Sequence, residues 1–209
     1  DEPFEKILAR HKVLLCFSTV SDPFNESVGN LLADFVDAGK VVFLAPFGFG
    51  MAGLFKHLSL FFKCSNNTST SGGRFKKRYE PLQNTSSQFF NCSLGEILQP
   101  SHPVMAGVKD VTSIYTIVAH VRHKKANVIA VSEPYGVKQS LHPMVIELKK
   151  KSGGVVLGIN VFPPAKEKGV VGGWPTLPRS DVPLLFSNAY YYALSITGVL
   201  RENNKKKKK

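Results

Sequence analysis

The residues able to do redox, metal or nucleophilic chemistry are few and scattered in this sequence. Its three cysteines, Cys16, Cys64 and Cys92, match no metal-binding spacing, and their odd number argues against a disulfide framework. Cys16 lies in an apolar run, which predicts a buried, unreactive thiol. His120 and His123 are three residues apart, a spacing that puts them on opposite faces of a strand. The sequence therefore predicts neither a metal site nor a cofactor.

A glycine-rich turn follows the second apolar run of the sequence. Gly48, Phe49 and Gly50 follow an apolar run, as in turns that hold phosphate at a helix N-terminus. The spacing is not that of a dinucleotide site, and no acidic residue follows about 20 positions later. A tight turn that needs glycine conformations explains the same residues.

Basic residues outnumber acidic ones and predict an acidic partner. The formal net charge is +12; five of these charges belong to the lysines at 205–209, and seven are spread over the rest of the chain. Clusters at 74–78, 122–125 and 149–151 favour an acidic protein surface or assembly subunits, with nucleic acid as the alternative. The last cluster also fits a solvated hairpin turn. The predicted contact patch comprises Arg74, Lys76, Lys77, Arg78, Arg122, Lys124 and Lys125.

Composition limits the class of protein. The chain is 43% hydrophobic and 20% charged, which excludes a protein that is disordered from end to end. No apolar run approaches the ~20 residues of a membrane span, so membrane insertion is not expected. The first residues lack the basic-then-apolar pattern of a signal peptide. Together with the cysteine pattern, this predicts a cytoplasmic, reducing location.

Helix and strand patterns alternate along the chain. A short amphipathic helix over residues 4–10 precedes apolar strands at 13–17 and 41–44, and a helix from about 25 to 38 separates these strands. A strand, a helix and a second strand that follow one another over residues 13–44 predict a parallel βαβ unit. Later strands are expected at 113–120, 127–131, 144–148 and 155–161, the last two joined by a hairpin turn at 149–154.

The remaining segments complete a one-domain prediction over residues 1–200. Residues 64–93 are rich in Ser, Asn, Thr and Gly, which predicts a long mobile loop. Residues 183–200 predict a closing helix, and the lysine-rich residues 201–209 a disordered tail. The pattern as a whole predicts an α/β fold with a mostly parallel sheet and an antiparallel extension.

Several segments, in this order, resemble the class I glutamine amidotransferase-like superfamily, and most closely its uncharacterised or ThuA-like branches. They are residues 13–18 (VLLCFS), 29–39 (GNLLADFVDAG), 41–44 (VVFL), 102–108 (HPVMAGV), 154–164 (GVVLGINVFPP) and 185–190 (LFSNAY). The resemblance implies a flavodoxin-like sheet. It also implies an initial βαβ unit of about 30 residues that this sequence has no room for. A reduced sheet or a fragment of a longer polypeptide would explain this, and a partner could cover the open edge.

The resemblance does not extend to the catalytic residues of an amidotransferase. The family's nucleophilic cysteine sits in a strand-to-helix turn, but the matching residues 45–50 (APFGFG) contain no Cys, Ser or Thr. The family's Gln-Phe-His-Pro-Glu stretch corresponds to Asn-Val-Phe-Pro-Pro at 160–164, so Phe162 and Pro164 replace the base and the carboxylate that orients it. Glutaminase activity is therefore not expected.

Two classes of function remain open beside nucleic-acid association. The first is a non-catalytic amidotransferase-like domain that acts as a structural or protein-interaction module in a larger assembly. The second is a small-molecule-binding or hydrolytic domain that uses the crevice beyond the carboxyl ends of the strands. Glu133 is the one carboxylate placed there as a base. The residues expected to line this crevice are Ser18, Gly48, Phe49, Gly50, Glu133 and Asn160.

Overall fold

The structure is a computed structural model of the 209-residue chain. It describes residues 3–16, 26–45, 82–121, 123–134, 142–161, 164–165, 174–175 and 180–199. In these ranges, none of the helices combines the length and the apolar character needed to span a bilayer.

The N-terminal part of the fold is a helix followed by a βαβ unit. α1 (Phe4–Arg10) precedes β1 (Val13–Cys16), and α2 (Glu26–Asp37) lies between β1 and β2 (Val41–Leu44) in the chain. β1 and β2 pair in parallel. α2 is followed by Gly39, whose φ of 78° is a conformation that residues with a side chain rarely adopt. The hydrophobic pattern predicts these four elements, and the structure confirms them.

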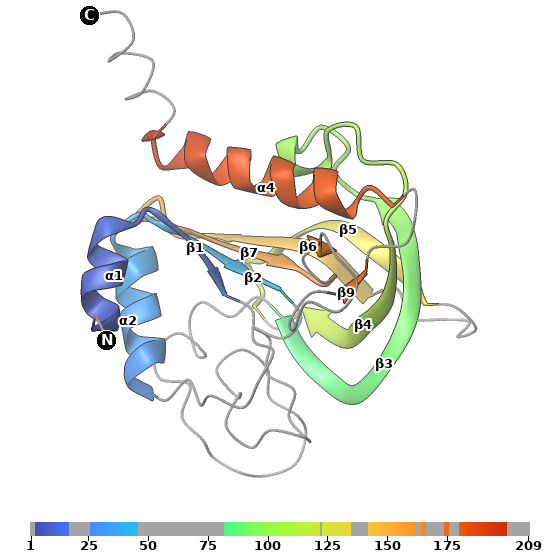
Figure 1. The fold of residues 1–209 in the computed structure, drawn as a ribbon, viewed down its shortest axis with the longest axis horizontal. Coiled ribbons are helices and arrows are strands. Elements are labelled where there is room, and N and C mark those ends of the chain that lie inside the picture. Colours follow the sequence, from blue (N-terminus) through green and yellow to red (C-terminus); the bar gives the residue numbers. More distant parts are fainter. Residues whose placement is uncertain are drawn as a thin grey trace, which may run out of the picture.

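The seven strands of the main sheet are arranged in the order β1-β2-β7-β6-β5-β3-β4 (Figure 1). β1, β2 and β7 pair in parallel, and all other neighbours in this sheet pair antiparallel. The other elements are β3 (Leu82–Ile97), η2 (Pro103–Met105), β4 (Thr112–Val121), β5 (Asn127–Pro134), β6 (His142–Lys149), β7 (Val155–Ile159), the short pair β8 (Pro164–Ala165) and β9 (Trp174–Pro175), and α4 (Val182–Ile196). The predicted α/β class, with parallel strands, flanking helices and an antiparallel extension, is confirmed.

The loop predicted over residues 64–93 is wrong for its second half. Residues 82–93 belong to β3, which pairs with β4 on one side and β5 on the other. The polar composition of this strand resembles a loop, but its first part pairs with β4, β5 joins it only from Cys92 onward, and register shifts interrupt the pairing with each of them. Residues 64–81 and the predicted tail at 201–209 lie outside the described residues.

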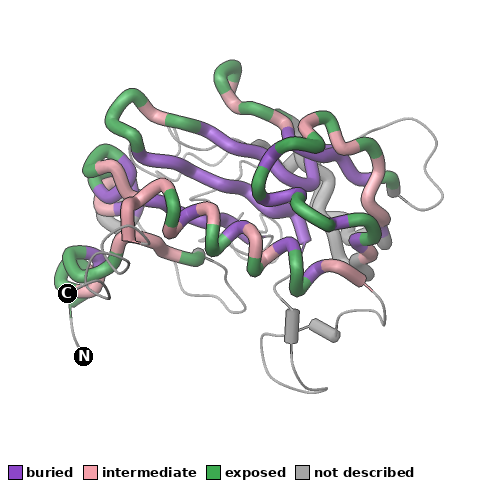
Figure 2. Tube along the Cα trace, turned by 90° about the horizontal axis from the view of Figure 1, so that it is seen from above, coloured by how far each residue is buried: buried purple, intermediate pink, exposed green. Residues whose placement is uncertain are grey.

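Two hydrophobic cores lie on opposite faces of the sheet. α1 and α2 cover one face, where Leu32 and Val36 of α2 pack against Val42 and Ile146. α4 covers the other face together with the η2 segment, and Leu185 packs there with other buried side chains. Figure 1 shows the helices on their respective sides, and Figure 2 shows buried strands joined by exposed turns. β6 and β7 are buried along almost their whole length because both faces of the sheet are covered.

The predicted hairpin turn between β6 and β7 is confirmed and packs tightly against α2. Lys150 N donates to Gly154 O at 2.8 Å, and Ser152 Oγ donates to Val36 O, at the end of α2, at 3.2 Å. A Cβ atom added to Gly154 would lie only 1.8 Å from Val36 O, whereas one added to Gly153 would meet nothing within 4 Å. The turn can therefore approach α2 only with glycine at position 154.

We predict that Gly154→Ala destabilises the fold far more than Gly153→Ala. The first substitution forces α2 and the hairpin apart and should cost more than about 3 kcal/mol, or prevent folding. The second strains only a left-handed residue, with φ of 87°, and should cost about 1 kcal/mol. Urea unfolding of the two variants measures the difference, and equal losses of stability would contradict the close packing.

Candidate functional site

The carboxyl ends of β1, β2, β7 and β5 meet at one edge of the sheet, where the sequence predicts a ligand crevice. β7 is parallel to β1 and β2, and β5 runs in the same direction because β6 between them is antiparallel to both. Asn160 follows the last residue of β7, and Ser132 and Glu133 lie near the end of β5. The structure thus places Glu133 and Asn160 at the predicted edge. Ser18, Gly48, Phe49 and Gly50 lie outside the described residues.

The buried polar side chains at this carboxyl edge bind the backbone of β6. Asn160 is fully buried; its backbone N donates to Met144 O at 2.7 Å and its Nδ2 to Pro143 O at 3.3 Å. Ser132 is also fully buried, and its Oγ donates to His142 O at 3.2 Å. These side chains hold the start of β6 in place.

Glu133 is exposed and pairs with Ser93 of the neighbouring strand β3, and its side chain lies close to Gly95. A Cβ atom added to Gly95 would come within 2.9 Å of Glu133 Cγ, so this glycine leaves room for the glutamate side chain. Among the described residues, no group of three or more His, Cys, Asp or Glu side chains could hold a metal ion.

The predicted basic patch is only partly described. Lys124 and Lys125 are exposed in the turn between β4 and β5. Arg74, Lys76, Lys77, Arg78 and Arg122 lie outside the described residues.

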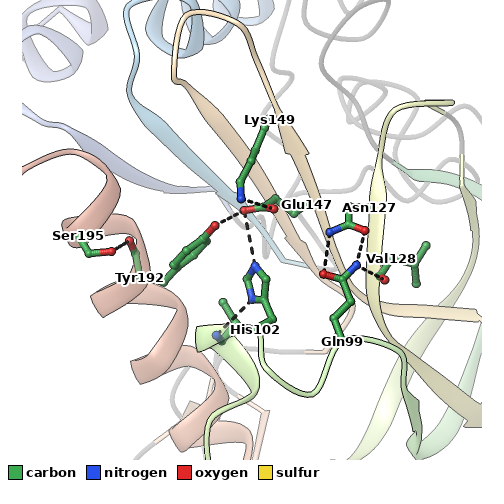
Figure 3. Close-up of polar contacts among 9 residues, drawn as sticks. Gln99, His102, Asn127, Val128, Glu147, Lys149, Tyr192 and Ser195 are labelled. Carbon is green, nitrogen blue, oxygen red and sulfur yellow. Dashed lines mark hydrogen bonds and ion pairs between the residues drawn. The ribbon is translucent and has the colours of Figure 1, made fainter.

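A buried polar cluster that the sequence prediction missed lies beneath α4 (Figure 3). Glu147 of β6 is 2% exposed and accepts a hydrogen bond of 2.5 Å from the Tyr192 hydroxyl of α4. Lys149 Nζ lies 3.1 Å from the other Glu147 carboxylate oxygen, and its side chain reaches solvent. His102, just before η2, places Nε2 3.8 Å from Glu147 Oε1. The cluster therefore joins β6, α4 and the η2 segment.

The orientation of His102 is set by its neighbours. Its Nδ1 accepts a hydrogen bond from Val104 N at 3.3 Å, which leaves Nε2 facing Glu147, and its ring meets the Tyr192 ring edge-on at 4.8 Å. Nε2 is buried and lies beyond hydrogen-bond distance of any partner. An imidazole held by ring packing and one backbone bond, with its Nε2 buried, supports the structure.

The cluster keeps Glu147 ionised although it is buried. Burial by itself raises the pKa of Glu147, but the polar contacts with His102, Tyr192 and Lys149 and the charge of Lys149 outweigh it, so the pKa is lowered from 4.5. Burial, and then the bond to Glu147, raise the pKa of Tyr192. Interaction with the Tyr192 hydroxyl, and then with Glu147, raises the pKa of Lys149. A neutral tyrosine and a charged lysine thus stabilise one buried carboxylate.

A second polar contact ties the η2 segment to β5. Gln99 and Asn127 exchange hydrogen bonds through their side-chain amides, and Gln99 Nε2 also donates to Val128 O at 3.2 Å (Figure 3). The segment that carries His102 is therefore anchored before it reaches the cluster.

Comparisons with known proteins establish the fold. No protein-family profile and no curated protein matches the chain. Among solved structures, it is similar to a putative ThuA-like protein from Bacteroides uniformis (TM-score 0.60, 12% identity, 91% of this chain and 72% of that one). It is also similar to the N-terminal domain of mmIFT52 (0.60, 9%, 92% and 81%) and to the cytoplasmic protein STM3548 from Salmonella typhimurium (0.56, 13%, 90% and 74%). The chain thus has a fold like that of ThuA-like proteins.

We predict that Glu147→Gln lowers the free energy of unfolding by about 2 kcal/mol at pH 7, because the charge-assisted bonds are lost. The lowered pKa of Glu147 stabilises the fold above the ordinary value of 4.5, and this contribution disappears as the pH falls through the folded-state value. The difference between wild type and variant should therefore shrink on acidification. Urea unfolding from pH 7 to 3 measures it, with the exposed Glu133→Gln as control. A difference independent of pH would contradict the cluster.

Proposed function

We propose that the chain is a non-catalytic, amidotransferase-like α/β domain that serves as a structural or protein-interaction module in a larger assembly. The sequence supports this, because the turn at 45–50 carries no nucleophile and Phe162 and Pro164 occupy the positions of the base and its orienting carboxylate.

The observation that carries the proposal is that two polar side chains at the carboxyl edge of the sheet are buried and hydrogen-bonded to the backbone of β6. Ser132 and Asn160 are fully buried, and both donate to backbone carbonyls at the start of β6. A catalytic group has to meet substrate with a free lone pair or proton, and these groups are committed to the fold. Among the described residues of this edge, Glu133 is exposed and offers a single carboxylate.

The comparisons support a modular role. The mmIFT52 structure is by its name an N-terminal domain, so in that protein the fold forms one unit of a longer chain. We place this chain in the reducing cytoplasm as part of the same proposal. One similar structure is a cytoplasmic protein by name.

The proposal predicts a stable set of partner proteins. The tagged full chain, expressed in the cell that makes it, is captured at low and high salt, with and without nuclease, and its companions are identified by mass spectrometry. We expect the same proteins after nuclease treatment. Recovery of a monomer alone contradicts the assembly role, and companions lost with nuclease indicate a nucleic-acid-associated subunit instead.

The proposal also predicts that the chain does not hydrolyse glutamine. Ammonia release should equal that of buffer for the wild type, for Glu133→Gln and for Glu96→Gln, a control at another exposed carboxylate of the sheet. Activity that Glu133→Gln abolishes and Glu96→Gln retains would overturn it and make the carboxyl edge a catalytic site.

A further inference from the structure

The edge of the sheet opposite the candidate crevice gathers lysines that are far apart in the sequence. Two turns form its middle: the β4–β5 turn with Lys124 and Lys125, and the β6–β7 turn with Lys150 and Lys151. We call these four residues the basic edge. The sequence shows them only as two separate clusters.

Strand register brings the two turns together. Asn127 at the start of β5 pairs with Glu147 near the end of β6, so the residues just before Asn127 lie beside those just after Glu147. The row continues along the sheet, because Val155 of β7 pairs with Val41 and Val41 with Val13. Strands are about 4.8 Å apart, so Lys40 and Lys12, which precede β2 and β1, extend the basic edge sideways.

Both turns are held in fixed shapes. In the β4–β5 turn, Ala126 N donates to His123 O at 2.8 Å and Lys125 N donates to His123 Nδ1 at 3.1 Å. The β6–β7 turn is closed by its own backbone bonds and bound to the end of α2 through Ser152. The backbone that carries these lysines is thus ordered before any partner arrives, which reduces the entropy lost on binding.

Two lysines beside the basic edge have contacts within the fold. Lys149 is bound to Glu147, and Lys40 Nζ donates to Leu8 O at 2.8 Å, where it stabilises the C-terminal end of α1. Lys124, Lys125 and Lys151 are exposed. Burial, and then the charges of Lys150 and Lys125, lower the pKa of His123, which agrees with the closeness of the two turns.

We infer that the basic edge is the docking surface of the module and that it binds an acidic segment of a partner protein. This inference rests on the proposed function. At their described residues 123–126 and 149–154, neither turn has a Phe, Tyr or Trp side chain. The ring of His123 is half-buried and accepts a hydrogen bond from Lys125 N, so these residues offer no large exposed ring on which nucleic-acid bases stack. Its described cations are lysines, which bind carboxylates as point charges and lack the forked geometry of arginine.

The test compares two double charge reversals with the same change in net charge. Lys125→Glu with Lys151→Glu alters the basic edge, and Lys6→Glu with Lys109→Glu alters exposed lysines in α1 and before β4. Binding of a labelled, glutamate-rich peptide is followed by fluorescence anisotropy at low salt. We expect about tenfold weaker binding for the first variant and less than about threefold for the second. Melting curves confirm that both are folded.

Three results would overturn the inference. Equal weakening by both variants means that net charge alone attracts the peptide. Tighter, edge-dependent binding of a single-stranded RNA of equal charge assigns the surface to nucleic acid. If the basic-edge variant still captures the same cellular partners as wild type, the module role stands but its docking surface lies elsewhere; if wild type captures none, the proposed function itself fails.

Discussion

The β6–β7 hairpin is the feature on which the rest of this structure depends. β7 pairs in parallel with β2, and β6 pairs antiparallel with both β7 and β5, so the sheet changes from parallel to antiparallel at this hairpin. The turn fits against α2 only because Gly154 has no side chain. One close approach therefore fixes the position of α2, the register of the central strands and the place of the β6–β7 lysines.

The same hairpin contains Glu147, whose charge binds side chains on the face of the sheet that α4 covers. Glu147 is buried in β6 and would be costly there without partners. Tyr192, Lys149 and His102 surround it, and these contacts hold α4 and the η2 segment in place. Among the described residues of the carboxyl edge, Ser132 and Asn160 are buried and bind the start of β6. At the opposite edge Lys124, Lys125 and Lys151 are exposed, which is why we assign interaction to that edge.

Local patterns predict much of this fold, but not the contacts between distant segments. The apolar runs and helical spacing predict β1, α2, β2, the β6–β7 turn and α4. Residues 82–93 of β3 were predicted as loop because they are rich in Ser and Asn, and their strand conformation depends on pairing with the distant strand β4. The cluster was missed because His102 and Tyr192 lie 45 residues away from Glu147 on opposite sides along the sequence. A glutamate inside the apolar run at 144–148 was the available signal, since a buried charge needs partners.

The most direct test of the central claim is hydrogen exchange on the chain alone and in complex with its captured partner. Residues 123–126 and 149–154 contain the two turns of the basic edge, and their amides should exchange more slowly together when the partner is bound. The carboxyl edge around Ser132 and Asn160 should exchange at unchanged rates. Protection at the carboxyl edge with none at the two turns would contradict the account and return attention to the predicted crevice.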